Sequence, residues 1–331
     1  MHDVRTFLSR NDKQISKSIK RFFTRFHVSS ALKASNAYKK KGVPVMEIFQ
    51  YLFLLIFSNR SMYMNLITRR NTPDFAKDTV YRFMKMIQIN WIRFTTILST
   101  RIIRDAILPL NSEDRANVLI IDDSMFERNR SKKVELLAKV YDHAKHKYRF
   151  GFRMLTLGWS DGSTFLPVNS VLLSTENRKN RINEATEVDK RTVGYKRKEY
   201  LCLISTDVNL DENEIIRIYG KRWDIEVFFK VCKSYLNLSK ECNSLSYDAM
   251  TAHTAVVFTR YMMLSLESRE SNDNRSLREL FLYFSDEMSD ITWIQAFQML
   301  LQMFRTMLLD NTELSDEKIN EIQQQKGGLS K

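Results

Sequence analysis

The segment from Tyr219 to Lys233 constrains the fold of this chain more than any other. It reads Tyr-Gly-Lys-Arg-Trp-Asp-Ile-Glu-Val-Phe-Phe-Lys-Val-Cys-Lys. On an α-helix of 3.6 residues per turn, Tyr219, Arg222, Glu226 and Lys233 fall within about 60° of one face. We call these four residues the polar stripe. The rest of the helix is mostly apolar, which is typical of a buried helix, so the polar stripe is expected to line a cleft. One carboxylate among cations suits a site that holds a metal ion against phosphates.

The composition favours helices and argues against disulfides or zinc. The 331 residues include only 8 Gly and 4 Pro, and the length allows two domains or one core with appendages. The cysteines, Cys202, Cys232 and Cys242, lack the paired spacing of zinc sites and suit a reducing compartment. No apolar run approaches the ~20 residues of a membrane-spanning helix. The N-terminus lacks the apolar region of a signal peptide, so we expect a cytoplasmic location.

Positive charge gathers in the N-terminal third of the chain. Residues 1–110 contain 20 Lys and Arg against 6 Asp and Glu, whereas the rest of the chain is nearly balanced. An uneven basic region is typical of a protein that binds a polyanion such as DNA. A solvated basic surface would give the same composition.

Helical patterns occupy both ends of the chain. Pro44 is placed to open a helix that runs to about Phe57. A second helix is expected from Asp78, its N-cap, to Ile107, with a break near Asn90. Beyond residue 245 the pattern is again helical, over residues 247–267, 276–284 and 291–309.

The helix that begins at Asp78 follows a helix and a break, which is the order of a helix-turn-helix DNA reader. In that interpretation Tyr81 and Arg82 contact DNA. An ordinary helical bundle fits the same pattern, and only the basic charge of this region favours DNA.

Short apolar runs replace the helical spacing after residue 117. Asn-Val-Leu-Ile-Ile at 117–121 is expected to be a fully buried strand that ends at Asp122 and Asp123. Asp161-Gly162 indicates a hairpin turn. Further strands are expected over residues 148–159, 164–173 and 198–206. Strands between helical regions predict an α/β fold.

Acidic residues follow the predicted strands and the polar-stripe helix. Asp122 or Asp123 ends the first strand, Asp207 ends the fourth, and Glu226 lies one helix later. Buried carboxylates are costly unless cations hold them. Brought together, these carboxylates would suit Mg²⁺ or Mn²⁺ as ligands. A site with two such ions can activate water and stabilise a leaving 3′ oxygen. Taken singly, each of the strand-end Asp residues is more simply explained as the cap of a turn.

The polar stripe, the Ile-Asp-Asp-Ser strand end, the Asp-Gly hairpin and the helical C-terminus resemble bacterial insertion-sequence transposases of the DDE class, in particular insertion-sequence family four. The resemblance covers roughly residues 40–310. It implies a ribonuclease-H-like mixed sheet core with helical terminal regions and an enzyme that uses two Mg²⁺ or Mn²⁺ ions. It also implies double-stranded DNA partners, the terminal inverted repeats and the target, and is compatible with a homodimer on DNA.

The resemblance also assigns roles to residues. Glu226 matches the third catalytic acid, and Asp122 the first, with Asp123 as an alternative; Asp122 and Glu226 would bind metal. Tyr219, Arg222 and Lys233 match residues that contact DNA near the end of the element. The implied regions are a basic helical DNA-binding region at 1–112, a catalytic core at 113–240 and a helical C-terminal region at 241–331.

One departure from the family pattern concerns the second acid. Nothing in the chain resembles its usual surroundings, and Thr192 to Arg197 runs almost directly into the fourth predicted strand, which suggests an internal deletion near 190–200. Asp207 is the available substitute. Two hypotheses follow: a transposase that cuts and joins DNA, or a non-catalytic remnant that binds the ends of the element.

Other chemically distinctive side chains are expected to be structural. His143 and His146 are interpreted as part of a solvated basic segment rather than as metal ligands. The four tryptophans are expected in the core: Trp91, Trp159, Trp223 and Trp293.

Overall fold

The computed structural model of the chain describes residues 17–57, 62, 73, 75–111, 117–143, 145–175, 177, 179–184, 222–240, 244–270, 275–285, 297–298 and 300–302. Ser18–Tyr283 forms one compact unit, and Met1–Lys17 with Phe284–Lys331 forms a second. The sheet, the helices that cover it and the candidate site all belong to the first unit. The predicted strand at 198–206, Trp293 and the apparent deletion lie outside the described residues.

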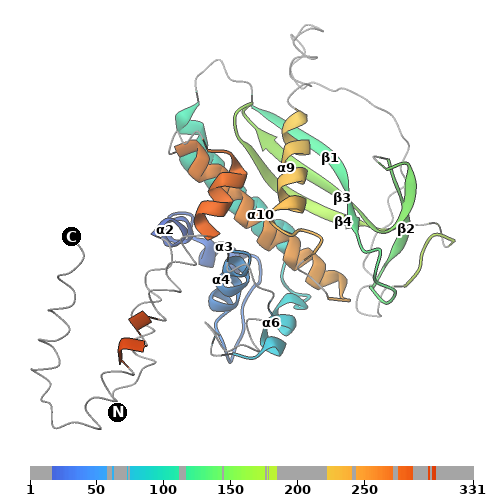
Figure 1. Ribbon diagram of the computed structural model, residues 1–331, viewed down its shortest axis with the longest axis horizontal. Helices are drawn as coiled ribbons and strands as arrows, with labels where there is room; N and C mark the ends of the chain where they lie inside the picture. The colour runs from blue at the N-terminus through green and yellow to red at the C-terminus, as the bar shows by residue number, and fades with distance from the viewer. Residues whose placement is uncertain are drawn as a thin grey trace, which may run out of the picture. The chain divides into compact units, whose positions relative to one another are not determined.

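An antiparallel sheet of four strands is the centre of the mixed α/β fold. The strands are β1 (Val118–Glu127), β2 (Ala138–Asp142), β3 (Lys147–Ser160) and β4 (Phe165–Leu173). Because β1 and β4 both pair with the stretch of β3 that ends at Ser160, they lie on its two edges. This architecture, with helices flanking the sheet (Figure 1), confirms the predicted fold class and is consistent with a ribonuclease-H-like core.

The predicted C-terminal end of the first strand was wrong. β1 has ten residues and continues through the two acids to Glu127. The strand tolerates them because alternate side chains point to opposite faces, and each carboxylate has its own guanidinium partner, Arg222 for Asp122 and Arg153 for Asp123. The strand was also expected to be fully buried, and several of its side chains are exposed or half-buried.

The apolar side chains of β1 divide between the two faces of the sheet. Ile120 is 8% exposed and Phe126 is fully buried, whereas Leu119 is 67% exposed and Ile121 is 65% exposed. Over residues 118–122 the covered face therefore carries the even-numbered residues of β1, among them Asp122. Near the end of the strand Met125 is buried as well, at 7% exposed.

The β3–β4 hairpin agrees with its prediction, whereas β2 was not predicted. The turn carries Asp161 and Gly162, and the Asp161 carboxylate accepts hydrogen bonds from the amides of Ser163 and Thr164, at 2.8 and 2.6 Å. β2 has only five residues, and its pattern is too short to separate from a loop.

Gly158 in β3 leaves room for an aromatic ring. A Cβ added at this position would lie 2.0 Å from Cζ of Phe165 on the next strand. We expect Gly158→Ala to lower the free energy of unfolding by about 1–3 kcal/mol, because the ring must move. Urea denaturation measures this. In the double variant Gly158→Ala/Phe165→Leu the two losses should be less than additive; simple additivity would contradict the predicted clash.

The N-terminal helices follow the predicted pattern with one correction. They are α2 (Lys17–Arg25), α3 (Val28–Ala34), α4 (Val45–Leu55), α6 (Lys77–Met84) and α7 (Trp91–Ile102). Pro44 is the N-cap of α4 as expected. The break near Asn90 is confirmed, because the Asn90 side chain caps α7 by accepting from the Arg93 amide at 2.9 Å. Asp78 is not an N-cap; it lies in the first turn of α6, whose N-cap is Ala76.

A π-helical turn (Ile103–Ile107) and a 3₁₀ turn (Leu108–Leu110) link α7 to the segment before β1. In the C-terminal half, α9 (Trp223–Ser234) precedes α10 (Tyr247–Glu270), and residues 277–285 are helical as predicted. No helix among the described residues is long and apolar enough to cross a membrane.

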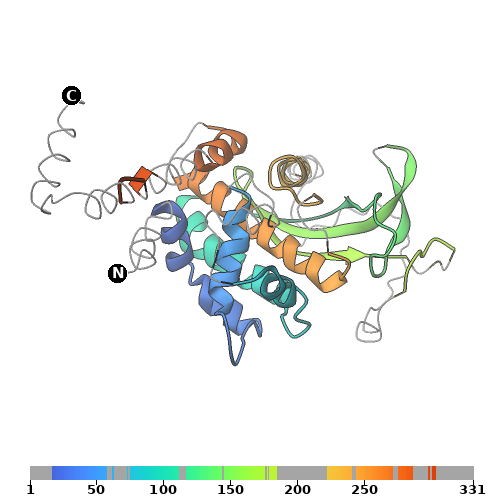
Figure 2. The ribbon, with the colours of Figure 1, turned by 60° about the horizontal axis from the view of Figure 1, so that its bottom comes forward.

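The long helix α10 is the core of the unit. It contacts α4, α6, α7, α9 and β4, and its side chains are buried from Ala252 through Glu267, as expected of a helix surrounded by other elements. Arg260 is 1% exposed, and its Nε donates to the Phe53 carbonyl of α4 at 3.0 Å. Figure 2 shows α10 between the N-terminal helices and the sheet, with α9 over one sheet face.

Candidate active site

Two carboxylates from distant parts of the sequence meet at one guanidinium. Nη1 of Arg222 donates to Oδ2 of Asp122 at 3.1 Å and lies 3.7 Å from Oε1 of Glu226. Asp122 lies on β1, and Glu226 on the first turns of α9. We call Asp122 and Glu226 the acid pair. Two like charges this close repel each other, and the guanidinium between them offsets that repulsion.

Helix α9 lies over the sheet because one of its faces is apolar. Its buried residues are Ile225, Phe228, Phe229, Val231 and Cys232. The Phe228 ring lies 5.1 Å from the ring of Phe165 on β4 and 4.8 Å from that of Tyr261 on α10, centroid to centroid. At the start of the helix, the Ser160 hydroxyl of β3 donates to Oδ2 of Asp224 at 2.6 Å. These contacts fix where α9 presents Glu226.

The burial predicted for α9 was too extensive. Trp223, expected in the core, is 71% exposed, and Val227 is 41% exposed. The sheet and α10 cover only one side of the helix, so apolar residues on the other side face solvent. By contrast, Trp91 and Trp159 are 5% and 7% exposed, as predicted.

Asp123 points to the other face of the sheet from Asp122. Its Oδ2 accepts from Nε of Arg153 at 2.5 Å, and Nη1 of Arg153 also donates to the Tyr141 carbonyl at 3.0 Å. The sequence left Asp122 and Asp123 as alternatives. The alternation of β1 brings Asp122, and not Asp123, to Arg222 and Glu226.

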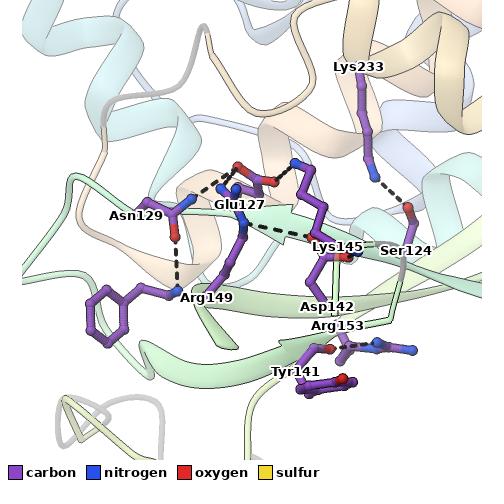
Figure 3. A network of polar contacts seen from close by, with 10 residues as sticks. Ser124, Glu127, Asn129, Tyr141, Asp142, Lys145, Arg149, Arg153 and Lys233 are labelled. Atoms are coloured by element: carbon purple, nitrogen blue, oxygen red, sulfur yellow. Dashed lines mark hydrogen bonds and ion pairs between the residues drawn. The ribbon is translucent and has the colours of Figure 1, made fainter. Parts of the chain in front are cut away.

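Lys233, the last residue of the polar stripe, also reaches β1. Its Nζ donates to Oγ of Ser124 at 2.5 Å (Figure 3). Ser124 and Asp122 are two residues apart on one strand and therefore share a face. Burial lowers the pKa of the Lys233 ammonium, and the nearby carboxylates of Asp142 and Glu127 oppose that shift. The stripe thus runs along β1, with Arg222 at Asp122 and Lys233 at Ser124.

A polar network that the sequence did not predict surrounds the end of β1 (Figure 3). Glu127 accepts from Nζ of Lys145 at 2.7 Å and from Nη1 of Arg149 at 3.0 Å. Nε of Arg149 also lies 3.8 Å from Oδ2 of Asp142. No local spacing in the sequence indicated this network, because the pairing of β1 with β3 brings Glu127 to Arg149.

The other predicted residues are not brought to the acid pair. Tyr219 and Asp207 lie outside the described residues. Tyr81 and Arg82 belong to α6, which lies away from β1 and α9 in both ribbon views (Figures 1 and 2). Arg82 is exposed, and its Nε donates to the Asp78 carbonyl at 3.2 Å. His143 and His146 are exposed, in keeping with a solvated segment.

The acid pair has the donor chemistry of a divalent-cation site. Carboxylate oxygens are the ligands that Mg²⁺ and Mn²⁺ prefer. Thr156 lies directly opposite Asp122 on β3, and its buried hydroxyl has no hydrogen-bond partner among the described residues. Such a buried polar group calls for an explanation, and an ion with its water ligands beside Asp122 would provide one. Within the described residues no group of three acidic, His or Cys side chains is placed to hold a metal.

Comparison of the sequence with known protein families found a match to one family model. A protein-family model described as DDE superfamily endonuclease matches residues 48–214, which is half of the chain. The match contains most of α4, the whole sheet and Asp122, and it ends before Arg222. A search of curated proteins gave no match.

Proposed function

This chain belongs to the DDE superfamily endonucleases, and we propose on that basis that it is a DNA transposase that cuts and transfers strands at the ends of a mobile element. The meeting of Asp122 and Glu226 at Arg222 carries the proposal. It joins an acid inside the family match to an acid beyond it, on the helix with the polar stripe. Insertion-sequence family four is the proposed subgroup, and the terminal inverted repeats and a target are the proposed DNA partners.

The proposed metal ligands are Asp122 and Glu226, with Asp207 as a candidate third ligand outside the described residues. A bound Mg²⁺ or Mn²⁺ would activate water and stabilise the departing 3′ oxygen. The chain's own cations have a different role. Arg222 can grip a phosphate with two parallel hydrogen bonds, and Lys233, held at Ser124, contributes a positive charge beside β1.

A non-catalytic remnant is the alternative function. One sequence feature favours this alternative. Near residues 192–198 nothing resembles the usual surroundings of the family's second catalytic acid. Such a protein would keep the basic N-terminal region and bind the ends of the element without cutting them.

Nicking of a DNA that carries the ends of the element separates the two functions. The substrate can be taken from the DNA that flanks the gene of this chain. With Mn²⁺ or Mg²⁺ we expect single-strand nicks at the ends, and with a chelator none. Binding without nicking in either metal would overturn the proposed enzyme and support the remnant.

Binding to double-stranded DNA is expected to weaken steeply as salt rises. The slope of log affinity against log salt should be about −0.9 per phosphate neutralised, because Lys and Arg release counterions from DNA. Fluorescence anisotropy with the full chain in a chelator measures this slope without cleavage. A slope near zero would argue for a helical interaction protein, since a basic region that binds phosphates must show salt dependence.

A further inference from the structure

Arg222 occupies the position between the acid pair where a cation is required. One nitrogen, Nη1, approaches both Oδ2 of Asp122 and Oε1 of Glu226. A divalent cation bound by the pair would use the same carboxylate oxygens. The guanidinium and the ion therefore compete for one set of lone pairs.

The contacts of Arg222 suit a group that can leave. Its side chain is 41% exposed, and it sits at the N-cap of α9 rather than under the helix. Arg153 on the other sheet face is less exposed, at 17%.

We propose that Arg222 neutralises the acid pair until a divalent cation displaces it, and that the released guanidinium then binds a DNA phosphate. This exchange rests on the proposed function, because it takes the acid pair as the metal site. The exchange means that a bound ion raises the affinity for DNA. By the same factor, bound DNA raises the affinity for the ion. Arg is suited to both roles, since its planar fork matches carboxylate and phosphate equally.

The first test measures Mn²⁺ affinity of the full chain without DNA, by calorimetry. Arg222→Gln should bind Mn²⁺ about fivefold more tightly or better, because its competing cation is gone. The control is Lys230→Gln, which removes an exposed positive charge one turn along the same helix from Glu226. It should change Mn²⁺ affinity much less than Arg222→Gln does. Equal or weaker binding by Arg222→Gln would overturn the exchange.

The second test measures DNA affinity with Ca²⁺ and with a chelator. Ca²⁺ takes oxygen ligands, and binding, not cleavage, is the readout. The unchanged chain and Lys230→Gln should gain about fivefold or more on adding Ca²⁺, whereas Arg222→Gln should gain little. A full gain in Arg222→Gln would contradict the release of Arg222 to phosphate.

Asp122→Asn separates this inference from the proposed function. If Asp122→Asn weakens Mn²⁺ binding but Arg222→Gln does not change it, the metal site stands and only the exchange fails. If the unchanged chain binds Mn²⁺ no better than Asp122→Asn, the acid pair is not the metal site, and both the exchange and the proposed function are overturned.

Discussion

Asp122→Asn is expected to lower the rate of metal-dependent DNA nicking by about a thousandfold or more, because in the proposed function the Asp122 carboxylate would hold the catalytic ion. Asn has nearly the shape of Asp, so β1 should keep its pairing with β3. Glu226→Gln should cause a similar loss, since it removes the other half of the acid pair. DNA binding in Ca²⁺ should persist in both variants, at least in part, through the basic N-terminal region.

Asp123→Asn is the matched control, one residue along the same strand. Its carboxylate lies on the opposite sheet face, at Arg153, so nicking should continue. The variant is expected to lose stability instead, because Arg153 is left without its charged partner in a largely buried position. Nicking rates and thermal melting of the two variants, measured side by side, distinguish these outcomes. Loss of nicking in Asp123→Asn with full activity in Asp122→Asn would contradict the assignment of the acid pair.

Phe228→Ala is expected to lower the free energy of unfolding by about 3–5 kcal/mol, the usual cost of emptying a buried aromatic position. The ring is fully buried and contacts Phe165 of the sheet and both Phe258 and Tyr261 of α10. It packs α9 against both the sheet and α10. Urea denaturation monitored by circular dichroism gives the loss directly.

Trp223→Ala is the control for that experiment, on the same helix. Trp223 is larger than Phe228 but is 71% exposed, so its loss should change stability by only about 0.5 kcal/mol or less. Phe228→Ala should also reduce nicking at temperatures where it remains folded, because α9 no longer holds Glu226 firmly beside Asp122. Equal stability losses in the two variants would show that α9 does not pack as described.

Local patterns predicted most of the elements well. The apolar runs and the Asp161-Gly162 turn predicted β3 and β4, and helical spacing predicted α4, α9 and α10. Such signals depend on residues near each other in the chain, and a single sequence contains them. β2 has only five residues, too few for alternation to stand out from a loop.

The burial of each face could not be predicted in the same way. The sequence of α9 is apolar on most sides, yet only the side towards the sheet and α10 is covered, so Phe228 is buried and Trp223 is exposed. The same limitation affected β1, where Leu119 and Ile121 were expected to be buried. What covers a face is set by elements far away in sequence.

The sequence by itself determined that an acid, an arginine and a lysine share one face of the helix near residue 226, because helical periodicity fixes their spacing. It left the directions of Asp122 and Asp123 open, because the strand was expected to end at these two acids. Only the tertiary structure decided which of them meets Glu226. That contact is made through Arg222, which lies 100 positions from Asp122. It depends on which sheet face α9 covers, and local spacing does not contain that information.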